Sequence, residues 1–222
     1  MRGHVCLWAT TGTLITTLLG HNGLVRSISF SPDGHLLATA GLDSSWRLWD
    51  LGTYTPIHTQ SDYGNWIWDL AFSPDGRFLA ISGADNIAQL WDVATCELLR
   101  SFRGHTQDIL AIEFSPDGRS LATGSVDRTI KTWDVETGEV LQTLTGHFDR
   151  INSIGYSPDG TLLVSGSGDE TIKIWNLATG KCWRYFKPPA PYLGLNVTGV
   201  NGLTDAAIAS LKTLGAIEID RS

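Results

Sequence analysis

A chain of 222 residues is long enough to bury one or two hydrophobic cores. Its apolar content of 42% is typical of a folded protein and excludes a disordered one. The net charge of −7, without any cluster of Lys or Arg, argues against nucleic acid or an anionic membrane as the main partner. The three cysteines are widely spaced and match no disulfide or metal-binding pattern, so we expect a cytoplasmic protein without a metal or cofactor.

From Gly20 and His21 onward, the sequence repeats with a period of 42 residues. The tetrapeptide Ser-Pro-Asp-Gly occurs four times, and a Trp followed by Asp or Asn keeps the same step. The Gly-His pair fills three of its four slots, and Asp62 with Tyr63 fills the remaining one. Such strict periodicity indicates a repeat fold. The tetrapeptides begin at Ser31, Ser73, Ser115 and Ser157, and the tryptophans are Trp49, Trp91, Trp133 and Trp175.

Within each period, apolar and polar residues alternate in four short runs, which predicts four antiparallel strands, here named a to d. In the third copy we expect them at 108–114, 121–125, 129–133 and 139–144. Residues 4–20 contain strands c and d alone. We therefore predict an all-β protein whose residues 1–187 form β-propeller blades, four full ones and a half blade. The half blade spans 4–20, and the full blades span about 21–61, 62–103, 104–145 and 146–187.

Gly-His, Ser-Pro-Asp-Gly and Trp-Asp at this spacing resemble the WD-repeat (WD40) family over residues 4 to about 186. The resemblance implies a ring of blades around a central channel, usually seven blades. It also implies a hydrogen-bonded tetrad in each blade. The tetrad joins the histidine of Gly-His, a Ser or Thr on strand b, the Asp of the b–c turn and the Trp of strand c. Carried onto this chain, the tetrads are His21–Thr39–Asp43–Trp49, His105–Thr123–Asp127–Trp133 and His147–Ser165–Asp169–Trp175.

The second blade departs from this pattern, because it has Tyr63 and Ile81 in place of the histidine and the hydroxyl. The two losses occur together, as expected of a buried network that is costly when half satisfied. A histidine near an Asp and a hydroxyl also resembles a catalytic triad. The same trio recurs in three blades, however, and an active site is usually needed once. We therefore interpret the tetrads as architectural, predict no catalytic residue and expect the chain not to be an enzyme.

Four blades and a half are fewer than the family's usual ring, so the predicted sheets leave open edges, which invite pairing with another chain. One interpretation is that the chain is the C-terminal part of a longer protein. The other is that the ring is completed by self-association or by the tail, residues 188–222. Three prolines break the repeat there, and a short helix is predicted at about 204–214 with Thr204 as its N-cap. The helix would pack on the last blade or dock a partner.

Residues 191–218 resemble the tails that end the WD-repeat regions of large bacterial NB-ARC/NACHT-type signalling ATPases. In those proteins the propeller is the presumed sensor, and an upstream P-loop domain binds the nucleotide. The chain itself contains no P-loop sequence. The resemblance implies that the chain is the sensor or scaffold part of a larger signalling protein.

A binding face is predicted where the copies differ. The d–a loops and the b–c turns share one end of the propeller, here called the first face, whereas the a–b and c–d turns share the second face. The second face is nearly identical in all copies, but slots on the first face differ in size and charge. Variable loops on a rigid scaffold commonly carry recognition, so we expect a protein or peptide partner. The candidate residues are Leu24, Arg26, Leu42, Trp66, Trp68, Leu110, Val126, Arg150 and Asn152.

Two function classes stay open at this point. The first is a protein-interaction module, and the second is a structural piece that self-associates to complete a ring. Trp66 and Trp68 bear on the choice, because they either form a binding surface or fill the space left by the missing tetrad of their blade.

Overall fold

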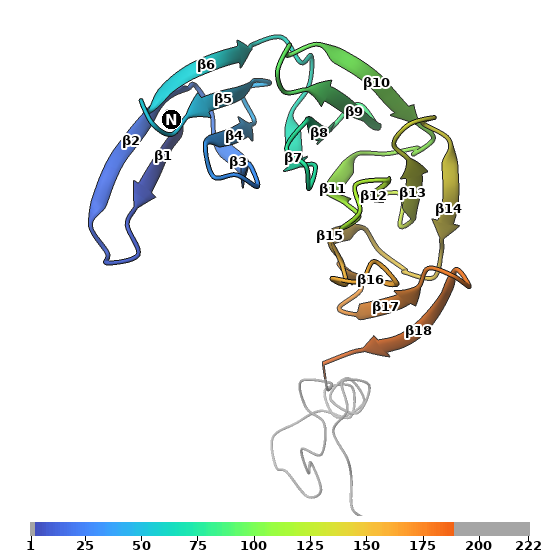
Figure 1. Ribbon diagram of the computed structural model, residues 1–222. Helices are drawn as coiled ribbons and strands as arrows, with labels where there is room; N and C mark the ends of the chain where they lie inside the picture. Colours follow the sequence, from blue (N-terminus) through green and yellow to red (C-terminus); the bar gives the residue numbers. More distant parts are fainter. Residues whose placement is uncertain (1–2, 189–222) are drawn as a thin grey trace, which may run out of the picture. The chain divides into compact units, whose positions relative to one another are not determined.

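The computed structural model describes residues 3–188, which fold entirely into β-strands and connecting turns (Figure 1). Eighteen strands form five antiparallel sheets in this part of the chain, so the predicted all-β class is confirmed. None of the described residues forms a helix that could cross a membrane. The helix expected at about 204–214 lies outside the described residues. The described residues up to Tyr185 form one compact unit.

The half blade is a two-stranded sheet of β1 (Gly3–Trp8) and β2 (Leu14–His21). Each of the next four sheets has four strands that pair in chain order, as the blade prediction requires (Figure 1). Blade 1 contains β3 (Val25–Phe30), β4 (Leu36–Gly41), β5 (Trp46–Asp50) and β6 (Thr55–Gln60). Blade 2 contains β7 (Ile67–Phe72), β8 (Phe78–Gly83), β9 (Ile87–Asp92) and β10 (Leu98–Arg103).

Blades 3 and 4 repeat this arrangement, and the strands of blade 3 differ by at most one residue at each end from those expected from the sequence. Blade 3 contains β11 (Ile109–Phe114), β12 (Ser120–Ser125), β13 (Ile130–Asp134) and β14 (Val140–Leu144). Blade 4 contains β15 (Ile151–Tyr156), β16 (Leu162–Ser167), β17 (Ile172–Asn176) and β18 (Lys181–Phe186).

The Ser-Pro-Asp-Gly motif recurs because it closes the a–b turn with its own side chains. In blade 3, the hydroxyl of Ser115 donates to Oδ1 of Asp117 at 2.6 Å and accepts from the backbone N–H of Ser120 at 2.9 Å. Asp117 also accepts from the backbone N–H of Arg119 at 3.0 Å. Gly118 has φ of +70°, a conformation that glycine adopts without steric cost. The turn therefore requires a small hydroxyl, a carboxylate and a glycine at these spacings.

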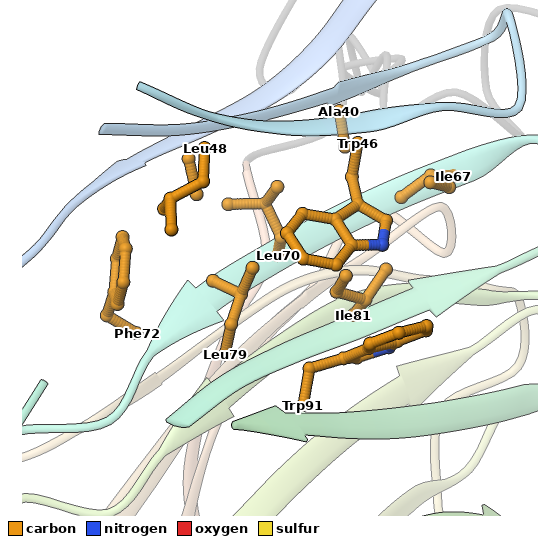
Figure 2. Packing of buried hydrophobic residues seen from close by; sticks show 10 residues of the cluster. Ala40, Trp46, Leu48, Ile67, Leu70, Phe72, Leu79, Ile81 and Trp91 are labelled. Atoms are coloured by element: carbon orange, nitrogen blue, oxygen red, sulfur yellow. The ribbon is translucent and has the colours of Figure 1, made fainter. Parts of the chain in front are cut away.

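The hydrophobic core lies between consecutive blades. Strands b and c of one blade pack against strands a and b of the next, and Figure 2 shows Trp46 of blade 1 lying near Leu70 and Ile81 of blade 2. Trp46 also meets Trp91 edge to face, with ring centroids 5.2 Å apart. Because each blade is covered by its neighbour, the burial of a residue depends on the adjacent repeat.

Asp69 on β7 joins the innermost strands of three blades. Its Oδ1 accepts from the hydroxyl of Ser27 on β3 at 2.7 Å, and its Oδ2 accepts from the backbone N–H of Ile112 on β11 at 3.0 Å. Burial raises the pKa of Asp69, although these hydrogen bonds oppose the shift. The equivalent residues of blades 3 and 4 are Ala111 and Ser153, so this bridge occurs once in the described residues.

Candidate functional site

In blade 3, one buried hydroxyl connects the residues of the expected tetrad. Oγ1 of Thr123 accepts from the indole N–H of Trp133 at 2.8 Å and lies 2.8 Å from Nε2 of His105. The other ring nitrogen of His105, Nδ1, lies 2.8 Å from Oδ2 of Asp127. Asp127 also accepts from the backbone N–H of Thr106 at 3.0 Å. The chain of hydrogen bonds thus ties strand c, strand b, the d–a loop and the b–c turn together.

The same geometry occurs in blades 1 and 4. In blade 1, Nε2 of His21 lies 2.8 Å from Oγ1 of Thr39, which also accepts from the indole N–H of Trp49 at 2.9 Å. Nδ1 of His21 lies 3.1 Å from Oδ1 of Asp43. The corresponding distances in blade 4 are 2.8 Å for His147–Ser165, 2.8 Å for Trp175–Ser165 and 2.9 Å for His147–Asp169.

Burial sets the protonation of the blade 1 tetrad. Burial lowers the pKa of His21, and the hydrogen bond and the charge of Asp43 only partly offset this effect. His21 is therefore neutral at pH 7. A neutral ring protonated on Nδ1 donates to Asp43 and accepts from the hydroxyl of Thr39, so that every polar atom of the tetrad has a partner.

The tetrads are architectural rather than catalytic. The hydroxyls of Thr39, Thr123 and Ser165 are buried, and each already accepts from a tryptophan indole. A catalytic hydroxyl must instead be free to reach a substrate. No group of three or more His, Cys, Asp or Glu side chains that could hold a metal ion occurs in the part of the chain that the structure describes.

Blade 2 fills the position of the tetrad with apolar packing. Ile81 is fully buried where the other blades have a hydroxyl, and the indole N–H of Trp91 donates to Oε1 of Gln89 at 3.1 Å. Tyr63 packs on the core between blades 1 and 2, and burial raises the pKa of its hydroxyl. Sequence reasoning missed the role of Gln89. The signal was present, because the equivalent residues of the other blades are Arg47, Lys131 and Lys173.

The predicted residues of the first face differ in exposure. Leu24 is 58% exposed and Trp66 is 52% exposed. The remaining residues of the set fall into two groups. Arg26, Arg150 and Asn152 are exposed, whereas Leu42, Trp68, Leu110 and Val126 are partly buried.

Trp66 and Trp68 do not fill the space of the missing tetrad. Ile67 between them is fully buried in the core, whereas Trp66 is exposed and Trp68 is partly buried. Neither indole belongs to the buried cluster between blades 1 and 2. Their rings meet edge to face, with centroids 5.8 Å apart and an interplanar angle of 83°.

Trp68 also connects its blade to both neighbours. Its indole N–H donates to Oδ2 of Asp108 in blade 3 at 3.1 Å, and the guanidinium of Arg26 in blade 1 lies 6.0 Å from its ring centroid. Trp68 therefore holds the more exposed Trp66 in place. Asp108 is the residue of blade 3 equivalent to Trp66, and its role as the acceptor for Trp68 depends on a contact between blades that the sequence does not display.

The first prediction concerns the hydroxyl network. His105→Ala leaves Thr123 and Asp127 each without one buried partner, so we expect it to lower the free energy of unfolding by about 1–3 kcal/mol. Urea denaturation measures this change. Combining His105→Ala with Thr123→Val should be less destabilising than the sum of the two single changes, because both remove the same network. Additive effects, or a neutral His105→Ala, would show that the network does not stabilise the blade.

The second prediction concerns acid. Burial alone would raise the pKa of Asp127, but hydrogen bonds from His105, Thr129 and the backbone of Thr106 outweigh it and hold the pKa well below its ordinary value. The stability contributed by this carboxylate is therefore present above the unfolded-state pKa of about 3.9 and is lost as the pH falls through the folded-state value.

Asp127→Asn should destabilise the protein at pH 7. The difference in the free energy of unfolding between the variant and the wild type should shrink as the pH falls below about 4. Denaturant titrations across this pH range test it, with Asp62→Asn, at an exposed position, as the control. If this difference in the free energy of unfolding stays constant over the whole acidic range, the charge of the carboxylate contributes nothing to stability.

The comparisons with known proteins agree with this architecture. The family described as WD domain, G-beta repeat matches residues 12–50, 54–92, 96–134 and 138–176. Each of the last three matches starts just before strand d of one blade and ends on strand c of the next. The sequence repeat is thus offset from the blade by one strand, and β1 lies outside the matches.

Three curated relatives show the same repeats over short stretches. Nuclear distribution protein PAC1-1 of Uncinocarpus reesii is 49% identical over 47 residues, 21% of this chain and 10% of the relative. Periodic tryptophan protein 2 homolog of Schizosaccharomyces pombe is 40% identical over 63 residues, 26% of this chain and 7% of the relative. WD repeat and SOCS box-containing protein 1 of Takifugu rubripes is 43% identical over 51 residues, 22% of this chain and 12% of the relative.

The matches therefore span a small share of the length of these relatives, between 7% and 12%. The repeat family, in contrast, covers more than half of this chain, the full blades have the four strands expected of them, and three of the four contain the tetrad that the resemblance implied. The chain belongs to the WD40 family of WD-domain, G-beta repeat proteins.

Proposed function

We propose that the chain is a protein-interaction module and that its first face binds the partner. The observation that carries the proposal is Trp66, which is 52% exposed, whereas Trp46, Trp49, Trp133 and Trp175 are almost completely buried. An exposed tryptophan held in place by its neighbours is a typical anchor of a protein interface, since little conformational entropy is lost on binding. WD40 domains typically bind protein partners, which supports the same conclusion.

The predicted first face has the composition of an interface. Leu24 supplies a second exposed apolar side chain, and Arg26, Arg150 and Asn152 supply exposed polar groups. An apolar centre with a polar rim is the usual anatomy of a protein–protein contact. The tail resemblance favours a larger signalling protein of the NB-ARC/NACHT type, in which this face would be the sensor. The unpaired thiols of Cys6, Cys96 and Cys182 favour a cytoplasmic location.

The third prediction separates binding from folding. Trp66→Ala should weaken capture of the partner by at least about 2 kcal/mol, the loss expected of a hot-spot aromatic, with a small effect on the melting temperature. Trp68→Ala should lower both the capture of the partner and the melting temperature, because Trp68 also contacts Asp108 and Arg26. The measurement is quantitative capture from lysate with immobilised protein, alongside thermal melts.

The control is Leu141→Ala, which removes an exposed apolar side chain from strand d, away from the first face. A photo-reactive amino acid at position 24 should also crosslink the captured protein, whereas the same group at position 141 should not. Unchanged capture by Trp66→Ala, together with equal crosslinking from both positions, would rule out the first face as the binding surface.

A second candidate function, end-to-end association of copies, is favoured by apolar side chains exposed on blade 4 and on blade 1, whose neighbouring half blade consists of two strands. Ile172 of blade 4 is 49% exposed, while its equivalent in blade 3, Ile130, is fully buried. Ile28 of blade 1 is 53% exposed, while its equivalent in blade 2, Leu70, is 4% exposed. Blade 4 and blade 1 thus each expose an apolar side chain at a position that is buried between other blades. Contact between blade 4 of one copy and blade 1 of the next would be a head-to-tail association.

The fourth prediction concerns this surface. Light scattering of the purified chain should show a molar mass that rises with concentration, and Ile172→Glu should abolish the rise because it places a charge in the contact. Thr161→Glu, in an exposed turn of the same blade, should leave the association unchanged. A constant monomeric mass at every concentration would eliminate self-association and leave the interaction module as the only proposed function.

A further inference from the structure

A groove of about 750 Å³ lies between blades 2 and 3 on the second face. Blade 2 contributes Phe78 and Leu90 from strands b and c and Leu99 from strand d. The a–b turns of both blades contribute one arginine each, Arg77 and Arg119. The groove is therefore apolar along one wall and basic at its turns, and it is formed by different residues from those of the first face.

The basic residues distinguish this groove from those between the other blades. The residues equivalent to Arg77 and Arg119 are His35 in blade 1 and Thr161 in blade 4. Among the four described blades, only the groove between blades 2 and 3 thus has an arginine from the a–b turn on both sides. The second face was expected to be nearly identical in all copies, and at these turns it is not. A position that varies on a repeated scaffold is a candidate for recognition, on this face as on the first.

A third arginine shapes the groove from within. The guanidinium of Arg100 on β10 donates to the backbone carbonyl of Thr137 at 2.8 Å and to that of Glu136, both in the c–d turn of blade 3. Arg100 thus fixes this turn across the blade boundary. The grooves between blades 1 and 2 and between blades 3 and 4 have His58 and Gln142 at this place, and Arg184 of blade 4 has no following blade among the described residues.

The two turn arginines have no carboxylate partner. Between residues 3 and 188, no Arg or Lys nitrogen lies within 4.0 Å of a carboxylate oxygen, and the contacts within that distance all join a tetrad histidine to an Asp. Arg77 and Arg119 are both exposed, and the guanidinium of Arg77 lies 5.0 Å from the ring centroid of Phe78. Asp134 also lines the groove and keeps its negative charge, since the hydrogen bond that its Oδ1 accepts from the backbone N–H of Thr137 at 2.7 Å lowers its pKa.

We propose that this groove binds an extended acidic peptide segment that carries a leucine-type side chain between its carboxylates. The carboxylates would be bound by Arg77 and Arg119, since arginine pairs with carboxylates through two parallel hydrogen bonds. The apolar side chain would pack against Phe78, Leu90 and Leu99. The exposed Glu136 at the rim repels an acidic segment, so the carboxylates are placed at the two a–b turns rather than at this c–d turn.

Fluorescence polarization with two labelled peptides tests the proposal. The probes are Asp-Leu-Asp-Glu-Leu-Asp and its basic counterpart Lys-Leu-Lys-Lys-Leu-Lys. The acidic probe should bind at least about tenfold more tightly than the basic one, and its affinity should fall as the salt concentration rises. Replacing both leucines of the acidic probe by serine should reduce its affinity. Equal binding of the acidic and basic probes would overturn the proposal, as would saturating binding of neither.

Matched variants locate the site. Arg77→Ala combined with Arg119→Ala should lower the affinity for the acidic probe by about tenfold or more, because two charge-assisted contacts are lost. His35→Ala combined with Thr161→Ala changes the equivalent positions of the other blades and should leave the affinity unchanged. Trp66→Ala should also leave it unchanged, so this test and the test of the first face can fail independently. An unaffected affinity in the arginine variant would overturn the proposal.

Discussion

One buried hydroxyl on strand b organises each regular blade of this protein. Oγ1 of Thr123 accepts from Trp133 and meets His105, so the hydroxyl joins strand c to the loop that arrives from the preceding blade. The histidine then positions Asp127, which in turn accepts from the backbone of that loop. A hydroxyl in a dry environment is costly unless it is fully paired, and for this reason the histidine and the hydroxyl are kept or lost together, while blade 2 keeps the Asp and the Trp.

Blade 2 shows how a blade is built when this hydroxyl is absent. Ile81 and Tyr63 fill the space with apolar atoms, and Gln89 takes over as the acceptor for Trp91. The same blade carries the exposed Trp66 on the first face and Arg77 on the second face. The blade that departs from the repeat therefore contributes to both proposed interaction surfaces, while the regular blades on either side supply a rigid frame.

The sequence predicts what each repeat determines by itself. The strands of blade 3, the Ser-Pro-Asp-Gly turns and the three tetrads all depend on residues within a single period, and all occur in the structure. The contacts between blades were not predictable in the same way. Asp69 with Ser27 and Trp68 with Asp108 join positions about one period apart, and nothing within one repeat specifies which neighbour a side chain meets. The helix expected in the tail stays a prediction.

Hydrogen exchange of the tryptophan indoles, followed by NMR, tests the role of the hydroxyl most directly. The indole N–H of Trp133 should exchange slowly, at a rate set by opening of the blade, because its acceptor is the buried Thr123. The indole of Trp66 should exchange quickly, since its side chain is half exposed. Thr123→Val should accelerate exchange at Trp133 and leave Trp91 unchanged. Exchange at Trp133 as fast as at Trp66 in the wild type would contradict the account.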